Sequence, residues 1–246
     1  MNRIAVIGGT GASDLMLTEK ARETLIETPY GPPSSPVYHL QKGSTEFLFL
    51  ARHGPESTIP PHCVNYRANV WALHSLQPAC LIGVNAVGGI AASARPGRLF
   101  FPDQLIDYSW GREHSFNDAG QSPVRHVEFT EPFSGPLRDR LIGYAQALEL
   151  DFEASGTYGV TQGPRLETAA EIDRLERDGC DLVGMTAMPE AGLAREIGLD
   201  YAICAVVVNR AAGRGPHGMS LHAEIEQSLH DGIAQVRRLL DALSSP

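Results

Sequence analysis

Short apolar segments alternate with stretches of helical spacing along the whole chain. Each apolar segment has the length of a buried strand, and most are followed by glycine or polar residues. We expect strands over residues 4–7, 46–51, 79–86, 104–107, 156–161, 182–185 and 201–208. Alternation of strands and helices is typical of an α/β fold with a mixed or largely parallel central sheet flanked by helices.

Two stretches have apolar residues at clear helical spacing. In the first, Pro136 suits the opening turn, and one face carries Leu137, Leu141, Tyr144, Ala145 and Leu148. In the second, Ser220 is a suitable N-cap, and the apolar stripe is Leu221, Ile225, Leu229, Ile233, Val236, Leu240 and Leu243. Segments 29–36 and 210–218 are rich in glycine, proline and polar residues, so we expect loops there.

The composition predicts one globular domain with a small-molecule partner. The chain has 246 residues, of which 43% are hydrophobic, which is enough for one continuous core. No linker, repeat or low-complexity segment divides it, so we expect a single domain over residues 1–246. The formal net charge is -9 and no run of Lys or Arg occurs, so neither nucleic acid nor a membrane surface is an expected partner.

The cysteines and the N-terminus bear on location. Cys63, Cys80, Cys180 and Cys204 have no spacing typical of a zinc site or a redox pair, and we interpret them as buried thiols in a reducing compartment. The N-terminus leads directly into the first expected strand, without a signal sequence. No apolar segment is long enough to span a bilayer. These features predict a cytoplasmic protein.

Ligands of open α/β sheets bind beyond the carboxyl ends of strands, so the residues that follow each apolar segment are candidates. After the first strand, Gly8 and Gly9 allow close backbone approach, and the Thr10 hydroxyl can donate to an anion. A dinucleotide fingerprint needs G-x-G-x-x-G, but the frame that starts at Gly9 has Asp14 in its sixth position. A nicotinamide-dependent dehydrogenase is therefore disfavoured.

Three further strand ends carry candidate residues. Arg52 follows the strand over 46–51 and offers a donor fork that matches phosphate, although a surface ion pair is the alternative. Residues 85–89 are small, and they suit either amides that face a ligand or a tight turn. Thr186 can donate to an anion and Met185 can present an apolar surface; a helix cap and a core methionine are the alternatives.

Sequence motifs of other site types are missing. None of the nine histidines belongs to an H-E-x-x-H motif, so we expect no metal. The chain has neither the G-x-S-x-G of hydrolases nor the G-x-x-x-x-G-K-[ST] of P-loop proteins. The remaining hypothesis is an anion site without a metal.

Taken together and in this order, the strand ends resemble the trimeric purine nucleoside phosphorylase and methylthioadenosine phosphorylase family. The resemblance covers nearly the whole chain and is specific because seven short segments occur in one order. They are Ile7-Gly8-Gly9-Thr10-Gly11, Leu50-Ala51-Arg52-His53-Gly54, the run from Val64 to Leu73, Asn85-Ala86-Val87-Gly88-Gly89, the run from Gln162 to Glu171, the run from Gly184 to Glu190, and Val206-Val207-Val208-Asn209.

The resemblance implies a nucleoside phosphorylase-like fold with a phosphate pocket. The phosphate residues that it implies are Gly9, Thr10, Arg52, His53, the Ala86 amide and Thr186. It also places Met185 against the ribose, and Glu167 and Asn209 on the purine. His126 resembles a residue that family members lend to the ribose or 5' side of a neighbouring subunit's site, which implies a homotrimer.

The implied reaction is phosphorolysis of a nucleoside. Phosphate, a co-substrate fixed by Arg52 and His53, attacks ribose C1' while the purine leaves as an anion. A hydrogen bond from Asn209 to purine N7, acting with Glu167, offsets the charge that develops on the base. No metal or organic cofactor is needed for this chemistry.

Donor and acceptor counts favour 6-oxopurines. A Glu167 carboxylate accepts from the N1–H of hypoxanthine or guanine but would face the lone pair on adenine N1, and the Asn209 amide can donate to O6. The adenine-selective branch of the family has serine and aspartate at these two positions. The alternative for Glu167 is a solvated carboxylate in the first turn of a helix.

The 5' end of the ribose decides between substrates. Leu221 and Ile225 are one helical turn apart and can form an apolar slot for a methylthio group, so we expect S-methyl-5'-thioinosine as the substrate. His222 is adjacent, and a shift of one residue would let it bind the 5'-hydroxyl of inosine or guanosine. Methylthioadenosine cleavage and nucleoside binding without catalysis are further alternatives.

Overall fold

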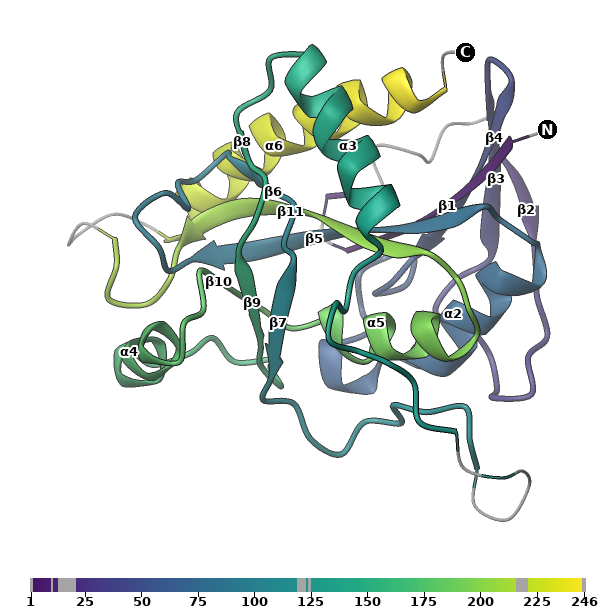
Figure 1. The fold of residues 1–246 in the computed structure, drawn as a ribbon, viewed down its shortest axis with the longest axis horizontal. Coiled ribbons are helices and arrows are strands. Elements are labelled where there is room, and N and C mark those ends of the chain that lie inside the picture. Colours follow the sequence, from purple (N-terminus) through teal and green to yellow (C-terminus); the bar gives the residue numbers. More distant parts are fainter. Residues whose placement is uncertain are drawn as a thin grey trace.

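A large mixed sheet forms the centre of the molecule (Figure 1). The computed structural model describes residues 2–9, 11–12, 21–118, 123, 125–215 and 221–244. Within these ranges the strands are β1 (Asn2–Gly8), β2 (Arg22–Thr24), β3 (Val37–Lys42), β4 (Thr45–Ala51), β5 (Cys80–Gly89), β6 (Leu99–Phe100), β7 (Gln104–Asp107), β8 (Phe152–Glu153), β9 (Thr157–Val160), β10 (Leu182–Gly184) and β11 (Tyr201–Arg210). The helices are η1 (Pro61–Cys63), α2 (Tyr66–Ser75), α3 (Gly135–Ala147), α4 (Ala169–Arg177), α5 (Ala187–Glu196) and α6 (Leu221–Leu243).

Strand pairing brings the candidate strand ends together. The main path of the sheet is β2-β3-β4-β1-β5-β10-β9-β7, and β11 pairs with β5 beside it. β1 is parallel to β4 and β5, with Gly8 opposite both Ala51 and Val84. β11 is parallel to β5, and β10 is antiparallel to β5 with Val183 opposite Gly88. The ends of β1, β4, β10 and β11 therefore meet along the second half of β5.

All seven expected strands are present, and the α/β fold with a mixed sheet is confirmed. One expectation is wrong: the segment 85–89 does not follow a strand but forms the second half of β5. Four strands were not expected, namely β2, β3, β6 and β8. Three of these have only two or three residues, too few to show a period along the sequence.

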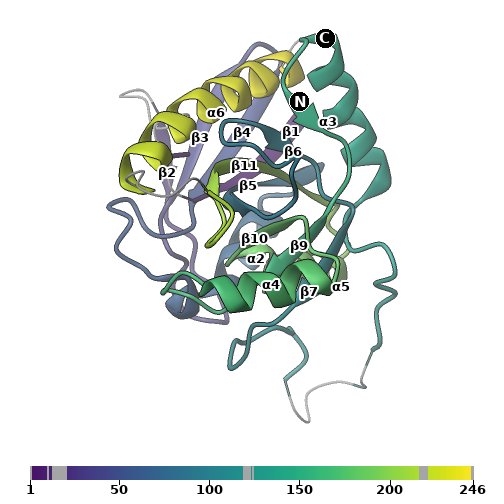
Figure 2. The same cartoon turned by 90° about the vertical axis from the view of Figure 1, so that its left-hand side faces the viewer.

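Helices cover both faces of the sheet. Figure 2 shows α3 and α6 on one side and α2, α4 and α5 on the other. The expected face of α3 is confirmed, because Leu137, Leu141 and Ala145 are buried. The stripe of α6 packs on β11 so closely that a side chain on Gly232 would lie 2.1 Å from Val206. Ser220, the expected N-cap of this helix, lies outside the described residues.

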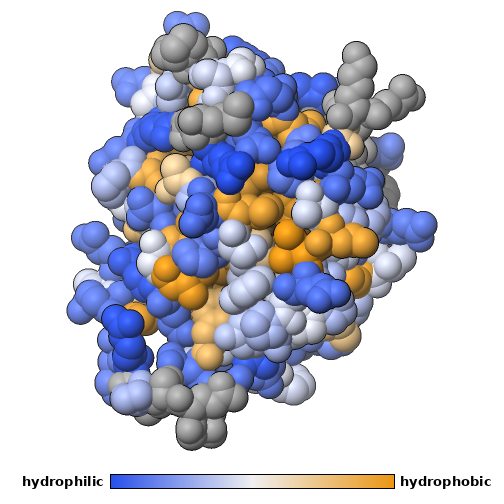
Figure 3. Space-filling view, turned by 90° about the vertical axis from the view of Figure 1, so that its right-hand side faces the viewer, coloured by the Kyte–Doolittle hydropathy of each residue, from blue (hydrophilic) through white to orange (hydrophobic). Residues whose placement is uncertain are grey.

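Apolar residues are exposed on one face of the molecule, and three of the four cysteines are buried. On the side that carries β2, β3 and β4, apolar patches lie between polar side chains (Figure 3), and Leu25 is among the exposed large apolar residues. The expectation of four buried thiols is wrong for Cys63, which is exposed; Cys80, Cys180 and Cys204 are buried. No helix in the described ranges is long and apolar enough to cross a membrane. Within the same ranges, no cluster of His, Cys, Asp and Glu is placed to hold a metal.

Candidate active site

A cavity of about 620 Å³ opens where the ends of β1, β4, β10 and β11 meet β5. Nine of the residues expected from the sequence line it: Gly9, Arg52, His53, Ala86, Glu167, Met185, Thr186, Asn209 and Ile225. These residues span 217 positions of the sequence, and only the sheet brings them together. We call this cavity the main pocket.

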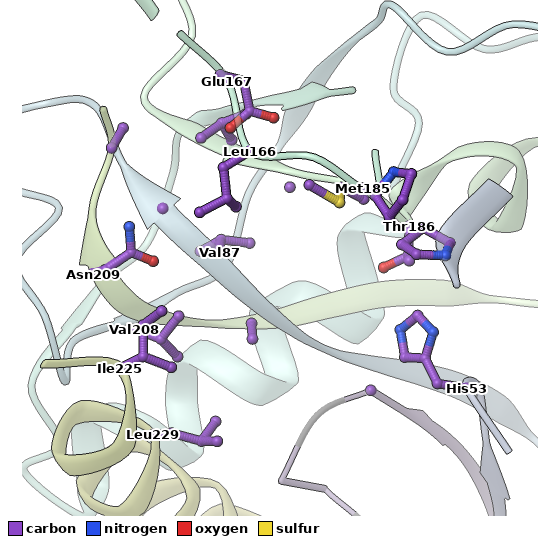
Figure 4. A pocket seen from close by; sticks show the side chains of 18 of the residues that line it. His53, Val87, Leu166, Glu167, Met185, Thr186, Val208, Asn209, Ile225 and Leu229 are labelled. Atoms are coloured by element: carbon purple, nitrogen blue, oxygen red, sulfur yellow. The ribbon is translucent and has the colours of Figure 1, made fainter. Parts of the chain in front are cut away.

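Different chemical groups occupy different parts of the main pocket (Figure 4). His53 and Thr186 lie at one end, whereas Glu167 and Asn209 lie toward the other. Met185 lies between these two pairs. The pocket therefore has an end rich in hydrogen-bond donors and an end with a carboxylate and an amide.

Arg52 is fully buried at the donor-rich end, which excludes the surface ion pair that was its alternative. Its Nε and Nη2 donate to the two carboxylate oxygens of Glu190 at 2.5 and 2.9 Å, and Glu190 is also fully buried. The donor fork expected for phosphate is thus engaged by a carboxylate. Burial alone would lower the pKa of Arg52, but the charge and hydrogen bonds of Glu190 outweigh it and raise that pKa, so the guanidinium stays charged.

One edge of the guanidinium still faces the main pocket. Arg52 Nη1 donates to Val84 O at 3.1 Å, which uses one of its two hydrogens. A side chain on Gly9 would lie 3.0 Å from Nη1 and 3.6 Å from His53 Nε2, so both nitrogens face the space above Gly9. Glycine is needed here because any β-carbon would occupy that space. An anion above Gly9 would meet a guanidinium N–H and an imidazole.

Asn85 connects Arg52 to Thr186. Its Oδ1 accepts from Arg52 Nη2 at 3.3 Å, and its Nδ2 donates to Thr186 Oγ1 at 2.8 Å. Thr186 occupies the N-cap position of α5, but its side chain makes no capping hydrogen bond. Since the oxygen of Thr186 accepts from Asn85, its own O–H is left to donate into the pocket. The helix-cap interpretation of this hydroxyl is therefore excluded.

His53 has a defined tautomer. Its Nδ1 lies 2.8 Å from Ile59 O, and a carbonyl only accepts, so Nδ1 carries a proton. Burial and the charge of Arg52 lower the pKa of His53, against the opposing effects of Ile59 O and Glu190. The ring is therefore neutral at pH 7, and Nε2 is an acceptor that faces the space above Gly9.

At the other end, Glu167 is half-buried and precedes the N-cap of α4, so it is not a solvated carboxylate within that helix. Thr161 Oγ1 donates to Glu167 Oε1 at 2.6 Å. The next residue, Thr168, forms a capping box with Glu171, and Arg165 makes two hydrogen bonds to the same Glu171 carboxylate. These contacts tie the loop that carries Glu167 to the start of α4.

Asn209 lies near the end of β11 and is half-buried. Its Nδ2 donates to Arg210 O at 2.6 Å, which fixes the orientation of the amide because its oxygen would repel a carbonyl. One N–H and the oxygen of this amide are left for a ligand. Asn209 can therefore donate one hydrogen bond and accept another in the pocket.

An apolar wall closes the side of the pocket near α6. Val208, Ile225 and Leu229 lie together there (Figure 4). The helix over Leu221 and His222 is described, but their side chains lie outside the described part of the structure, as does Thr10. Ile225 is thus placed as expected, whereas Leu221 and Thr10 stay predictions.

His126 is exposed and does not line the main pocket of its own chain. Its expected role, on a neighbouring subunit, stays a prediction.

Met185 lines the pocket and is only half-buried, so it is not a core methionine. Sequence reasoning gave no role to Glu190, although it ends one of the seven segments, or to Leu229, although its spacing of four from Ile225 was a usable signal.

A donor-rich end joined to an end with a carboxylate and an amide is the arrangement that phosphorolysis of a nucleoside requires. The family model described as "Phosphorylase superfamily" matches residues 3–245. The chain belongs to this superfamily.

Relatives of known name extend over nearly the whole chain. A protein of Pseudomonas syringae pv. tomato named "Probable S-methyl-5'-thioinosine phosphorylase" is 47% identical over 98% of this chain and 97% of its own length. The "6-oxopurine nucleoside phosphorylase" of Pyrococcus furiosus is 42% identical over 98% of this chain and 91% of its own. The structure of methylthioadenosine phosphorylase from Schistosoma mansoni in complex with adenine has a TM-score of 0.92 and 31% identity, and the match covers 99% of this chain and 91% of that one.

Proposed function

We propose that the protein is a purine nucleoside phosphorylase that cleaves 6-oxopurine nucleosides, with S-methyl-5'-thioinosine as its preferred substrate. The products are hypoxanthine and 5-methylthioribose 1-phosphate. The observation that carries this proposal is that Glu167 and Asn209 both lie toward the end of the main pocket away from His53 and Thr186. Relatives named for thioinosine and 6-oxopurine substrates support it.

Phosphate binds in the space above Gly9. Arg52 Nη1 and the Thr186 hydroxyl donate to its oxygens, with the Ala86 amide and Thr10 as further ligands. The neutral His53 accepts from a phosphate hydroxyl through Nε2, since this nitrogen has no proton to give. Phosphate held in this way places a nucleophile and a negative charge against C1' as the sugar becomes cationic.

In the reaction an oxygen of phosphate forms a bond to C1' while the bond from C1' to purine N9 breaks, and the electron pair of that bond goes to the purine. The free N–H of Asn209 donates to the N7 and O6 side of the base, where this negative charge develops. The Glu167 carboxylate accepts from N1–H. Loss of such a contact costs about 3 kcal/mol of barrier.

These groups select the base. Adenine presents a lone pair at N1, which a carboxylate repels, so the mismatch with a buried acceptor disfavours adenosine-type substrates strongly. Selection against adenine sets the protein apart from the methylthioadenosine phosphorylase whose fold it shares. Val208, Ile225 and Leu229 offer the 5' end an apolar wall rather than a partner for a hydroxyl, which favours the methylthio group over the 5'-OH of inosine.

The active form is a homotrimer in which His126 completes the ribose side of a neighbouring site. Two observations support this part: His126 is exposed and outside its own pocket, and apolar patches lie on the face of β2, β3 and β4 (Figure 3). No metal or organic cofactor takes part. Sedimentation of the active protein as a stable monomer would remove the role of His126.

The test is base release by the purified protein, with and without phosphate, from methylthioinosine, inosine, guanosine and methylthioadenosine, compared as kcat/KM. We expect turnover only with phosphate and a wide lead for methylthioinosine. If inosine or guanosine matches it, the base assignment stands and the apolar wall does not select the 5' group. If methylthioadenosine leads, Glu167 and Asn209 do not select a 6-oxopurine. If nucleoside binds without turnover, the protein is a nucleoside-binding protein.

A further inference from the structure

The Glu167 carboxylate is held from behind by a residue outside the main pocket. Thr161 Oγ1 donates to Glu167 Oε1 at 2.6 Å, the one hydrogen bond to this carboxylate within the described residues. Thr161 does not line the main pocket; it lines a second cavity of about 320 Å³, and Glu167 lines both cavities. The geometry points to Thr161 as a positioning residue that sets base selectivity through Glu167, an inference that rests on the proposed function.

The main chain of Thr161 is fixed on both sides. Its N–H donates to Gly184 O at 2.8 Å, which continues the β9–β10 pairing one residue beyond the end of β9. Its carbonyl accepts from Arg112 Nη2 at 3.2 Å. The backbone that carries the Thr161 hydroxyl is therefore fixed, so the Glu167 carboxylate takes the orientation in which it accepts from this hydroxyl.

Arg112 makes this support rigid. It is nearly buried, and its guanidinium donates to the carbonyls of Met185, Met188 and Gln162 at 2.7, 2.6 and 2.9 Å. The side chain thus bonds to the chain on both the β9 side and the β10 side. Thr161 lies between the contacts that Arg112 makes on the β9 side and on the β10 side, close to Met185, the residue expected against the ribose.

The hydroxyl has one proton and two acceptors within reach. Glu167 Oε1 at 2.6 Å is much closer than Gly184 O at 3.4 Å, so the proton goes to the carboxylate. The contacts of the loop hold the residues beside Glu167 and not its carboxylate, since Arg165 pairs with Glu171 and Thr168 caps α4. With Oε1 bound to Thr161, Oε2 is left as the acceptor for purine N1–H. Without this bond the carboxylate rotates toward water, and the penalty against adenine N1 falls.

The experiment compares kcat/KM for methylthioinosine and methylthioadenosine in wild type, Thr161→Val and Thr161→Ser. Valine keeps the shape and removes the donor, whereas serine keeps the donor. We expect Thr161→Val to lower the methylthioinosine to methylthioadenosine ratio about tenfold or more, because a hydrogen bond to a charged group is lost. Thr161→Ser should restore most of the ratio, and the KM for phosphate should be unchanged in both variants.

A Glu167→Ala background separates positioning from folding. If Thr161 acts through Glu167, Thr161→Val causes no further change of the ratio in that background. An unchanged ratio in Thr161→Val alone, or an equal loss in both backgrounds, overturns the inference. A wild type without preference for the 6-oxopurine refutes the proposed function instead, so the two failures are distinguishable.

Discussion

Replacing Glu190 by glutamine tests whether the buried ion pair with Arg52 is essential to the folded state. The carboxylate accepts three hydrogen bonds, two from Arg52 and one from the Tyr201 hydroxyl at 2.9 Å. Glutamine has nearly the same volume but no charge, and its amide group must point N–H toward one of these donors. The change therefore leaves a buried cation without its counter-charge.

The expected loss is large because both side chains are fully buried. Removing one member of a buried pair costs about 3 to 5 kcal/mol in free energy of unfolding. For a chain of this length, each kcal/mol lowers the Tm by about 2 to 4 °C, so we expect a fall of about 6 to 20 °C. Arg52 still donates to the carbonyls of Ile7 and Val84 and to the Asn85 side chain, so we expect the fall in Tm to lie toward the lower end of this range.

The assay is thermal unfolding without phosphate and at one protein concentration, because bound anions and subunit association both raise the Tm. Tyr201→Phe keeps the charge pair and should lose about 1 to 3 kcal/mol, the value of one hydrogen bond to a charged group. Glu176→Gln breaks an exposed pair with Arg214 and should change stability by less than about 1 kcal/mol. A Glu190→Gln variant no less stable than Glu176→Gln would refute the reasoning.

Three shorter predictions concern the main pocket. Gly9→Ala would place a methyl 3.0 Å from Arg52 Nη1, so we expect the KM for phosphate to rise about tenfold or more, and an unchanged value would contradict the phosphate site. Since the folded-state pKa of His53 is lowered, its neutral form stabilises the protein above about pH 6.5, and that stability is lost as the pH falls through the folded-state pKa. The test is urea unfolding of wild type and of His53→Asn, a variant that keeps a donor for Ile59 O. As the pH falls from 7.5 to 5, the free energy of unfolding of wild type should decrease relative to that of His53→Asn. A constant difference between the two proteins would refute this prediction. Leu229→Asp should lower kcat/KM for methylthioinosine about 10 to 200-fold relative to inosine, and an equal loss for both would show that the wall does not contact the methylthio group.

The sequence predicted the strands that build the main pocket because buried strands leave a strong local signal. Apolar runs marked β1, β4, β5, β10 and β11, and residues after or within these strands line much of the pocket; Glu167 and Ile225 come instead from the loop before α4 and from α6. The two-residue strands β6 and β8 leave no such signal, and the pairing of β6 with β11 and with β8 joins distant parts of the chain.

The supporting contacts could not be predicted, since they join residues far apart in the sequence. Arg52 and Glu190 are 138 positions apart, and nothing near Arg52 shows that its fork is already engaged. The same holds for Arg112, because most of its hydrogen bonds go to backbone carbonyls, which leave no side-chain pattern in the sequence. Nine of the expected residues thus line the main pocket, whereas Thr10, Leu221 and His126 stay predictions, and the partners of Arg52 were not expected.

The two ends of the main pocket share one frame, and this links the phosphate chemistry to the choice of base. Gly184 O accepts from the N–H of Thr161, whose hydroxyl donates to Glu167, and two residues after Gly184 comes Thr186, whose hydroxyl is left to donate into the main pocket. Arg112 bonds to the carbonyls on both sides of this junction. The separation between the two ends of the main pocket is therefore set by the pairing of β9 with β10 rather than by flexible side chains. Under the proposed function, the same pairing that places Glu167 for purine N1–H places C1' relative to phosphate.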